Sequence, residues 1–214
     1  LLITGSGGML GSSLYPALFK EDHTVLATDI VDPTLQVLDV RDYNQVLEAV
    51  NTFKPDIILH LSAMTDLEDC ERDPDQAYLT NTIGTQNVAL VCQSFGLPMV
   101  YVSTAGVFDG EKEGSYHEFD EARPINVYGK TKFEGEKIVE KLLSKYFIVR
   151  AGWMIGGGKK DKKFIMKIIK QLDEGKKELH VVDDKFGTPT YTEDFSFCLS
   201  KLILTQFYGL YHMV

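Results

Sequence analysis

Residues 1–11, LLITGSGGMLG, place a short apolar run directly before three regularly spaced glycines, Gly5, Gly8 and Gly11. The apolar run is typical of a buried strand, and the segment from Met9 onward is typical of a helix. A glycine lets a phosphate approach the backbone, and a helix N-terminus offers free N–H groups and a positive dipole end. The turn therefore predicts a dinucleotide site formed by Gly5, Gly8, Met9, Leu10 and Gly11. The alternative is a flexible glycine turn without a ligand.

The rest of the chain repeats this alternation of a short apolar run and an amphipathic segment. The expected strands after the first are residues 24–29, 35–39, 57–61, 99–103 and 147–150. The expected helices are residues 9–19, a helix capped by Asp42, residues 73–96 and residues 127–143. This order predicts an α/β fold with a Rossmann-type, doubly wound, mostly parallel sheet. Such sheets bind ligands at the carboxyl ends of their strands.

The alternation weakens after Arg150, which indicates a division of the chain. We expect residues 1–150 to form an NAD(P)-binding Rossmann domain and residues 151–214 to form a small substrate-side lobe. Because the chain stops on the apolar run 209–214, which resembles a strand, we expect this lobe to be truncated and the native product to continue past Val214.

Composition excludes several classes of function. The 214 residues are 44% hydrophobic and 25% charged, as in ordinary soluble globular proteins. A formal charge of −9 argues against a nucleic-acid partner, which requires a basic face. No apolar run is long enough for a membrane span, and no leader peptide is recognisable. The three cysteines lack metal-ligand spacing, so we expect no metal and a reducing, cytoplasmic location.

Two aspartates stand where the adenosine half of a dinucleotide would bind. Asp29 ends the second expected strand about 20 residues past the glycines, where an acid can accept hydrogen bonds from the ribose hydroxyls of NAD. This position favours NAD(H), with NADP(H) as the alternative; Asp29 could also be a solvated strand-end residue. Asp39 ends the next strand, where it could contact the adenine or cap a helix.

Thr104, Tyr128 and Lys132 form a candidate catalytic group. Tyr128 and Lys132 lie four residues apart, and so on one face of the expected helix, while Thr104 follows the strand 99–103. Reducing a ketone requires a proton as well as a hydride, and a nearby ammonium can lower the pKa of a tyrosine toward the range useful for acid–base catalysis. We expect Lys132 to act on Tyr128 in this way. The alternative is an amphipathic helix with an exposed lysine.

At this point the chain resembles the extended short-chain dehydrogenases, and within them the dTDP-4-dehydrorhamnose reductase family. The resemblance runs nearly end to end. It rests on LITG with GMLG (2–5, 8–11), PDII (55–58), ST with VFDG (103–104, 107–110), PINVYGKTK (124–132), RAGW (150–153), and VDD with GTPT (182–184, 187–190).

The resemblance implies a role for each matched position. Thr104, Tyr128 and Lys132 correspond to a catalytic triad with Tyr128 as the proton donor. The implied cofactor contacts are Gly8, Met9, Leu10, Asp29, Asp39, Val40, Ala63, Met64, Thr65, Val102, Tyr128 and Lys132. The implied substrate contacts are Thr104, Ala105 and Trp153.

One departure concerns the substrate. The family carries an acid and a tyrosine after the triad threonine, where this chain has Ala105 and Gly106. The resemblance implies a reductase of a nucleotide-linked 4-keto-6-deoxy sugar, with the nucleotide sugar as partner and a homodimer left open. The alternatives are an epimerase that keeps its NAD bound, a dehydratase, which would need acids after Thr104, and a regulatory subunit of the methionine adenosyltransferase type.

Two further features have simple interpretations. His60 lies within an apolar strand, which is typical of a hydrogen-bonded core residue. The cluster KKDKK at residues 159–163 follows three glycines and indicates a solvated loop, with electrostatic steering of a sugar diphosphate as the alternative.

Overall fold

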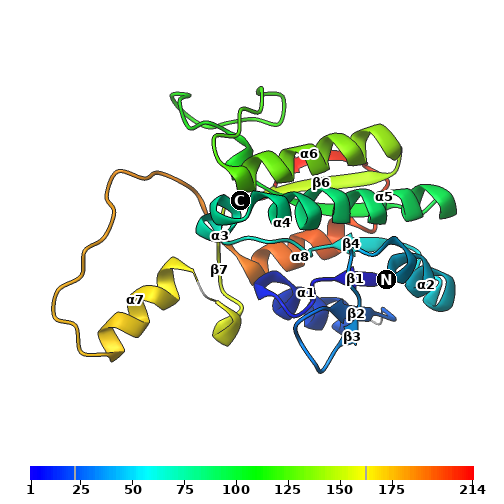
Figure 1. Ribbon diagram of the computed structural model, residues 1–214, viewed down its shortest axis with the longest axis horizontal. Helices are drawn as coiled ribbons and strands as arrows, with labels where there is room; N and C mark the ends of the chain where they lie inside the picture. Colours follow the sequence, from blue (N-terminus) through cyan, green and yellow to red (C-terminus); the bar gives the residue numbers. More distant parts are fainter. Residues whose placement is uncertain (22, 162) are drawn as a thin grey trace.

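The computed structural model describes residues 1–21, 23–161 and 163–214 and is built around one parallel sheet (Figure 1). Its seven strands lie in the order β3-β2-β1-β4-β5-β6-β9, and every neighbouring pair is parallel. The strands are β1 (Leu2–Thr4), β2 (Leu26–Asp29), β3 (Gln36–Val37), β4 (Ile58–His60), β5 (Met99–Thr104), β6 (Tyr146–Ala151) and β9 (Gly209–His212). The predicted doubly wound Rossmann fold is confirmed.

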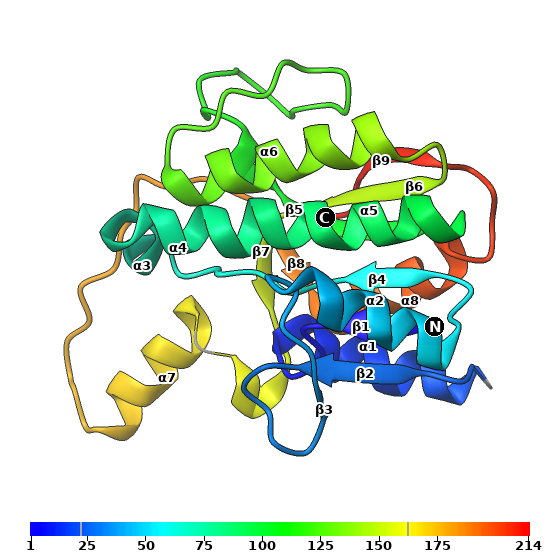
Figure 2. The same cartoon turned by 45° about the vertical axis from the view of Figure 1, so that its right-hand side comes forward.

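Helices cover both faces of this sheet (Figures 1 and 2). On one face lie α1 (Met9–Lys20) and α8 (Thr192–Leu202), whose residues Leu14 and Phe195 pack with the sheet residue Ile3. On the other face lie α2 (Tyr43–Phe53), α5 (Gly84–Phe95) and α6 (Val127–Leu142). Because both faces are covered, the central strands consist mainly of buried apolar residues and become polar only at their carboxyl ends.

The segment predicted as one helix over residues 73–96 has three parts. Asp73 caps α4 (Pro74–Tyr78), a single π-helical turn, η1, covers Leu79–Ile83, and α5 ends at Gly96, whose φ of 65° suits glycine. A short helix, α3 (Leu67–Arg72), precedes them. The π turn carries buried polar side chains, including Asn81. The ends of the segment follow capping rules, whereas the turn inside it depends on long-range contacts.

The expected lobe of residues 151–214 does not form one separate structural unit. Residues 152–191 contain β7 (Trp153–Ile155), η3 (Gly158–Lys160), α7 (Phe164–Asp173) and β8 (Pro189–Tyr191), and β7 pairs with β8 outside the main sheet. The chain then returns: α8 packs against α1, and β9 joins the main sheet beside β6. The boundary expected at residue 150 is therefore wrong for the last two elements, because their apolar residues complete the Rossmann core.

The segment around α7 projects from this body in Figure 1. None of the residues of α7 is buried. Among the helices of the described residues, none combines the length and apolar character needed to cross a membrane.

Candidate active site

The glycine turn between β1 and α1 is fixed by close packing. Gly5 has a φ of 73°, and a Cβ there would lie 2.7 Å from the backbone nitrogen of Ser62. A Cβ at Gly11 would collide with the backbone of Ser6. At Gly8, the N-cap of α1, an added Cβ would meet only a carbonyl oxygen, at 3.4 Å, and no side chain caps the helix. Gly5 and Gly11 therefore shape the turn, while the N-terminus of α1 at Gly8 has no side-chain cap.

Asp29 lies beside this turn. Its carboxylate accepts hydrogen bonds from the backbone nitrogens of Gly7 (3.0 Å), Val31 (2.7 Å) and Asp32 (3.2 Å). The residue is therefore tied into the loop rather than being a free strand-end acid. These bonds hold the end of β2 against the glycine turn, so the two predicted parts of the dinucleotide site are brought together.

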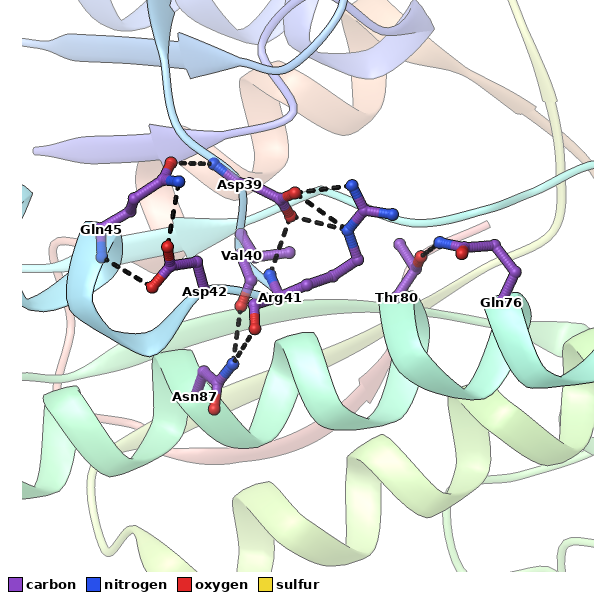
Figure 3. A network of polar contacts seen from close by, with 8 residues as sticks. All are labelled: Asp39, Val40, Arg41, Asp42, Gln45, Gln76, Thr80 and Asn87. Atoms are coloured by element: carbon purple, nitrogen blue, oxygen red, sulfur yellow. Dashed lines mark hydrogen bonds and ion pairs between the residues drawn. The ribbon is translucent and has the colours of Figure 1, made fainter.

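Asp39 and Val40 lie in the loop that follows β3 (Figure 3). The guanidinium of Arg41 binds both carboxylate oxygens of Asp39, with Nε at 2.8 Å and Nη2 at 2.6 Å, and this pairing lowers the pKa of Asp39. Asp42, not Asp39, caps α2, so the capping alternative for Asp39 is wrong. Val40 is buried, and its carbonyl oxygen accepts a hydrogen bond from Asn87 Nδ2 at 3.0 Å.

The loop after β4 carries Ala63, Met64 and Thr65, and the buried side chain of Asn81 fixes it. Asn81 Oδ1 accepts from the Met64 nitrogen at 2.8 Å, and its Nδ2 donates to the Met64 oxygen at 3.0 Å and to Thr131 Oγ1 at 2.9 Å. Sequence reasoning missed Asn81, because a polar residue inside an expected helix carries no indication of a partner 50 residues away.

We expect Asn81→Ala to weaken nicotinamide dinucleotide binding and to lower the free energy of unfolding by about 1–3 kcal/mol, since the Met64 nitrogen loses its acceptor and the Met64 oxygen and Thr131 Oγ1 each lose a donor. Fluorescence titration with NADH and urea unfolding measure the two effects. Gln93→Ala is the matched control, because Gln93 donates to a backbone carbonyl oxygen from the exposed side of α5. Equal dinucleotide binding by both variants would contradict this role for Asn81.

Thr104 and Tyr128 meet at the carboxyl end of β5. Thr104 is the last residue of β5, and its Oγ1 accepts a hydrogen bond from the Gly106 nitrogen at 3.0 Å. Tyr128 lies in the first turn of α6, which Asn126 caps by accepting from the Gly129 nitrogen at 2.7 Å. A Cβ at Gly106 would lie 3.3 Å from Thr104 Oγ1 and 4.0 Å from Tyr128 Cδ1, so both side chains border one point.

Lys132 is buried one turn further along α6. Its Nζ lies 4.1 Å from the centre of the Tyr101 ring, and its carbonyl oxygen accepts a hydrogen bond from the Tyr101 hydroxyl at 3.1 Å. Burial lowers the pKa of Lys132 to about 7, and the negative charge of Glu136 opposes that shift.

The expected effect of Lys132 on Tyr128 is not seen. Burial raises the pKa of Tyr128 to about 12, and a hydrogen bond with Thr104 opposes the rise. The Lys132 ammonium lies over Tyr101 instead, on the neighbouring strand. Tyr128 therefore keeps its proton at neutral pH in this structure, which is the state that a proton donor requires.

The remaining predicted residues differ in their exposure and in the element that carries them. Val102 is half-buried on β5, and Ala105 is exposed directly after Thr104. Trp153 is 53% exposed on β7, outside the main sheet, with Gly187 against its ring. The structure thus brings Thr104 and Tyr128 together, whereas Trp153 lies on the separate pair of strands β7 and β8.

Comparison with known proteins places the whole chain in one group. The family model described as the RmlD substrate binding domain matches residues 1–214. The spore coat polysaccharide biosynthesis protein SpsK of Bacillus subtilis is 34% identical over 213 residues, which cover 100% of this chain and 72% of SpsK. The dTDP-4-dehydrorhamnose reductase of Aggregatibacter actinomycetemcomitans is 36% identical over 220 residues, covering 99% and 72% of the two chains.

Solved structures of dTDP-4-dehydrorhamnose reductases have the same fold as this chain. A dTDP-4-dehydrorhamnose reductase from Clostridium acetobutylicum superposes with a TM-score of 0.89 at 38% identity, over 99% of this chain and 72% of that one. The Bacillus anthracis enzyme in complex with NADP gives the same four values. A Thermus thermophilus UDP-glucose 4-epimerase with NAD has a TM-score of 0.87 at 21% identity over 99% of this chain and 76% of its own, which shows the shared fold alone.

Proposed function

The chain belongs to the dTDP-4-dehydrorhamnose reductase family, whose RmlD substrate binding domain spans it completely, and we propose that it reduces the 4-keto group of a nucleotide-linked 6-deoxy sugar. The family makes it an NAD(P)-dependent oxidoreductase of the short-chain type. The observation that carries the finer proposal is the meeting of Thr104 and Tyr128 at the carboxyl end of β5. In open parallel sheets this edge is where ligands bind.

The residues present fit a nicotinamide dinucleotide. Gly8, Met9 and Leu10 offer the uncapped N-terminus of α1 to a pyrophosphate, and a Cβ at Gly8 would meet only the Gly5 carbonyl oxygen, at 3.4 Å. Asp29 lies against the glycine turn, at the position where a carboxylate contacts the adenosine ribose. Further contacts would come from Gly5, Gly11, Asp39, Val40, Ala63, Met64, Thr65 and Val102. The bound nicotinamide supplies the hydride.

Tyr128 and Thr104 act on the substrate oxygen in this proposal. Tyr128 donates its hydroxyl proton to the keto oxygen as the hydride adds to the carbon, so the carbonyl becomes an alcohol and the tyrosinate regains a proton from water. Thr104 Oγ1 aligns that oxygen with the Tyr128 hydroxyl. Lys132 donates to the nicotinamide ribose from its buried position in α6, one turn after Tyr128.

Ala105 and Gly106 bear on the choice of sugar. A side chain at residue 106 would lie against both Thr104 and Tyr128, and Gly106 leaves that space open. A roomy site without hydrogen-bonding groups discriminates weakly between ring substituents. We therefore infer that this protein accepts variation at a ring position next to the reduced carbon, with Trp153 contacting the sugar from β7.

The test is oxidation of added NADH or NADPH by the native, full-length protein in the presence of dTDP-4-dehydrorhamnose, with product identified by mass spectrometry. Stoichiometric loss of reduced cofactor and formation of the 4-hydroxy sugar support the reductase. The epimerase alternative predicts bound NAD that survives purification and no net consumption of cofactor. The alternative of a regulatory subunit predicts neither reaction, although it leaves the placement of Thr104 and Tyr128 without a purpose.

A further inference from the structure

A glycine- and lysine-rich segment lies over the dinucleotide site. This segment, the lysine loop (residues 156–161), begins with Gly156, Gly157 and Gly158, whose φ values of 114°, 71° and 54° are all in the region that favours glycine. A Cβ at Gly157 would lie 2.9 Å from the carbonyl oxygen of Met9. The loop is therefore packed directly on the first residue of α1, where the proposed cofactor phosphates would enter.

The lysine loop is anchored at the end of β2 by an ion pair. Lys160 Nζ lies 2.9 Å from Asp32 Oδ2, and this pairing holds the pKa of Asp32 well below its usual range. Just past the loop, Lys163 Nζ donates to the carbonyl oxygen of Thr65 at 2.9 Å, in the segment after β4. The contacts thus join the two sides of the proposed dinucleotide site, which come from parts of the chain far apart in sequence.

Asp32 belongs to the structure that holds Asp29. The Asp32 nitrogen donates to Asp29 Oδ1 at 3.2 Å, and a Cβ at Gly7 would lie 2.9 Å from both Asp29 Oδ2 and Asp32 Cβ. The ammonium of Lys160 is therefore bound to Asp32, whose backbone nitrogen is bonded to the carboxylate expected to accept from the ribose 2′-hydroxyl. Two acids here, in a chain of net charge −9, would repel a 2′-phosphate unless a cation offset them.

We propose that Lys160 is the specificity residue that admits a 2′-phosphorylated dinucleotide, exchanging its ion pair with Asp32 for one with the 2′-phosphate. The inference rests on the proposed function, because it places the adenosine ribose beside Asp29. Lys160 is suited to this exchange, since its side chain is 46% exposed and is bound to Asp32 through a single ion pair. Such partly exposed ion pairs contribute little free energy, so the exchange costs little. The ammonium on its long stem can reach either acceptor.

The experiment is calorimetric titration of the full chain with NADP⁺ and NAD⁺, and with adenosine 2′,5′-bisphosphate and AMP as fragments. We expect Lys160→Met to weaken NADP⁺ and the bisphosphate about tenfold, as loss of one charge-assisted contact does, and to leave NAD⁺ and AMP within twofold of wild type. Lys159→Met, which removes the same charge from the neighbouring position, should leave the ratio of the two affinities unchanged. Asp32→Asn should strengthen NADP⁺ severalfold, because it frees Lys160 and removes a repelling acid.

Equal weakening of NADP⁺ and NAD⁺ by Lys160→Met, or no weakening of either, would overturn the assignment. An equal effect of Lys159→Met on the NADP⁺ to NAD⁺ ratio would also overturn it, since the loss would then reflect general charge. Binding of neither dinucleotide by the wild-type protein would refute the proposed function together with this inference. Retained NAD⁺ binding with an unaltered ratio in Lys160→Met refutes the inference alone.

Discussion

Tyr128→Phe is expected to reduce the turnover of the keto sugar by about 100-fold or more, because general acid catalysis contributes about 10²–10⁴ to such reactions. The hydroxyl is the group that differs, and the ring keeps its place in the first turn of α6. Tyr128 is held with its proton on at neutral pH, since burial raises its pKa to about 12. The variant therefore loses a donor that is fully protonated in the wild-type protein.

Turnover and NADH binding are measured separately, so that a loss of proton donation can be distinguished from a loss of cofactor affinity. Tyr128→Phe should bind NADH within a few-fold of wild type, because the turn at Gly8 and the loop at Asp29 do not depend on the phenol. Tyr146→Phe, at the opposite end of the sheet where β6 begins, is the matched control and should turn over normally. Near-wild-type turnover by Tyr128→Phe would show that another group delivers the proton.

Local patterns were sufficient to predict the body of the fold. The glycines of residues 5–11, the Asp42 and Asp73 caps and Gly96 each act on their own neighbours, so their effect can be recognised in a short window. The alternation of strands and helices then predicts a parallel sheet with right-handed crossovers, whereas the order of its strands comes from the structure. The expected strands at residues 24–29 and 35–39 proved shorter, as β2 and β3, and the edge strand β3 ends where its pairing with β2 ends, after Val37.

The last part of the chain could not be predicted in the same way. Whether an apolar helix and strand form a separate lobe or return to an existing core depends on what covers them. Phe195 and Leu199 of α8 are buried in the core cluster that also contains Leu14 of α1, a contact across most of the sequence. The alternation that weakens after Arg150 gives no sign of this return.

In the candidate site, too, features set by local structure could be predicted from the sequence and long-range contacts could not. The strand end at Thr104 and the helix start at Tyr128 could be predicted to meet, because both follow from local structure. The partner of Lys132 could not, since the Tyr101 ring lies on β5 and no periodicity indicates which buried ring an ammonium will contact. Asp29 was expected to bind a ribose, and its bonds to backbone nitrogens within the loop emerged only from the structure.

Glu136→Ala is expected to lower the free energy of unfolding by about 3–5 kcal/mol, because it leaves a buried guanidinium without its partner. Glu136 and Arg150 are 1% and 4% exposed, and they form a two-point ion pair with Arg150 Nε to Oε1 at 2.9 Å and Nη2 to Oε2 at 2.6 Å. Ser103 Oγ also donates to Oε1, at 2.5 Å. The cluster joins α6 to β5 and β6 directly behind Thr104.

Urea unfolding followed by circular dichroism measures this loss, and the same helix provides the control. Glu134 pairs with Lys137 on the exposed face of α6, so Glu134→Ala should cost less than about 1 kcal/mol. The double variant Glu136→Leu with Arg150→Met removes both charges and keeps the volume, so it should be more stable than Glu136→Ala alone. If Glu136→Ala unfolds at the same urea concentration as Glu134→Ala, the buried pair does not hold the helix to the sheet, and the position of Tyr128 must be fixed by other contacts, such as the Asn126 cap.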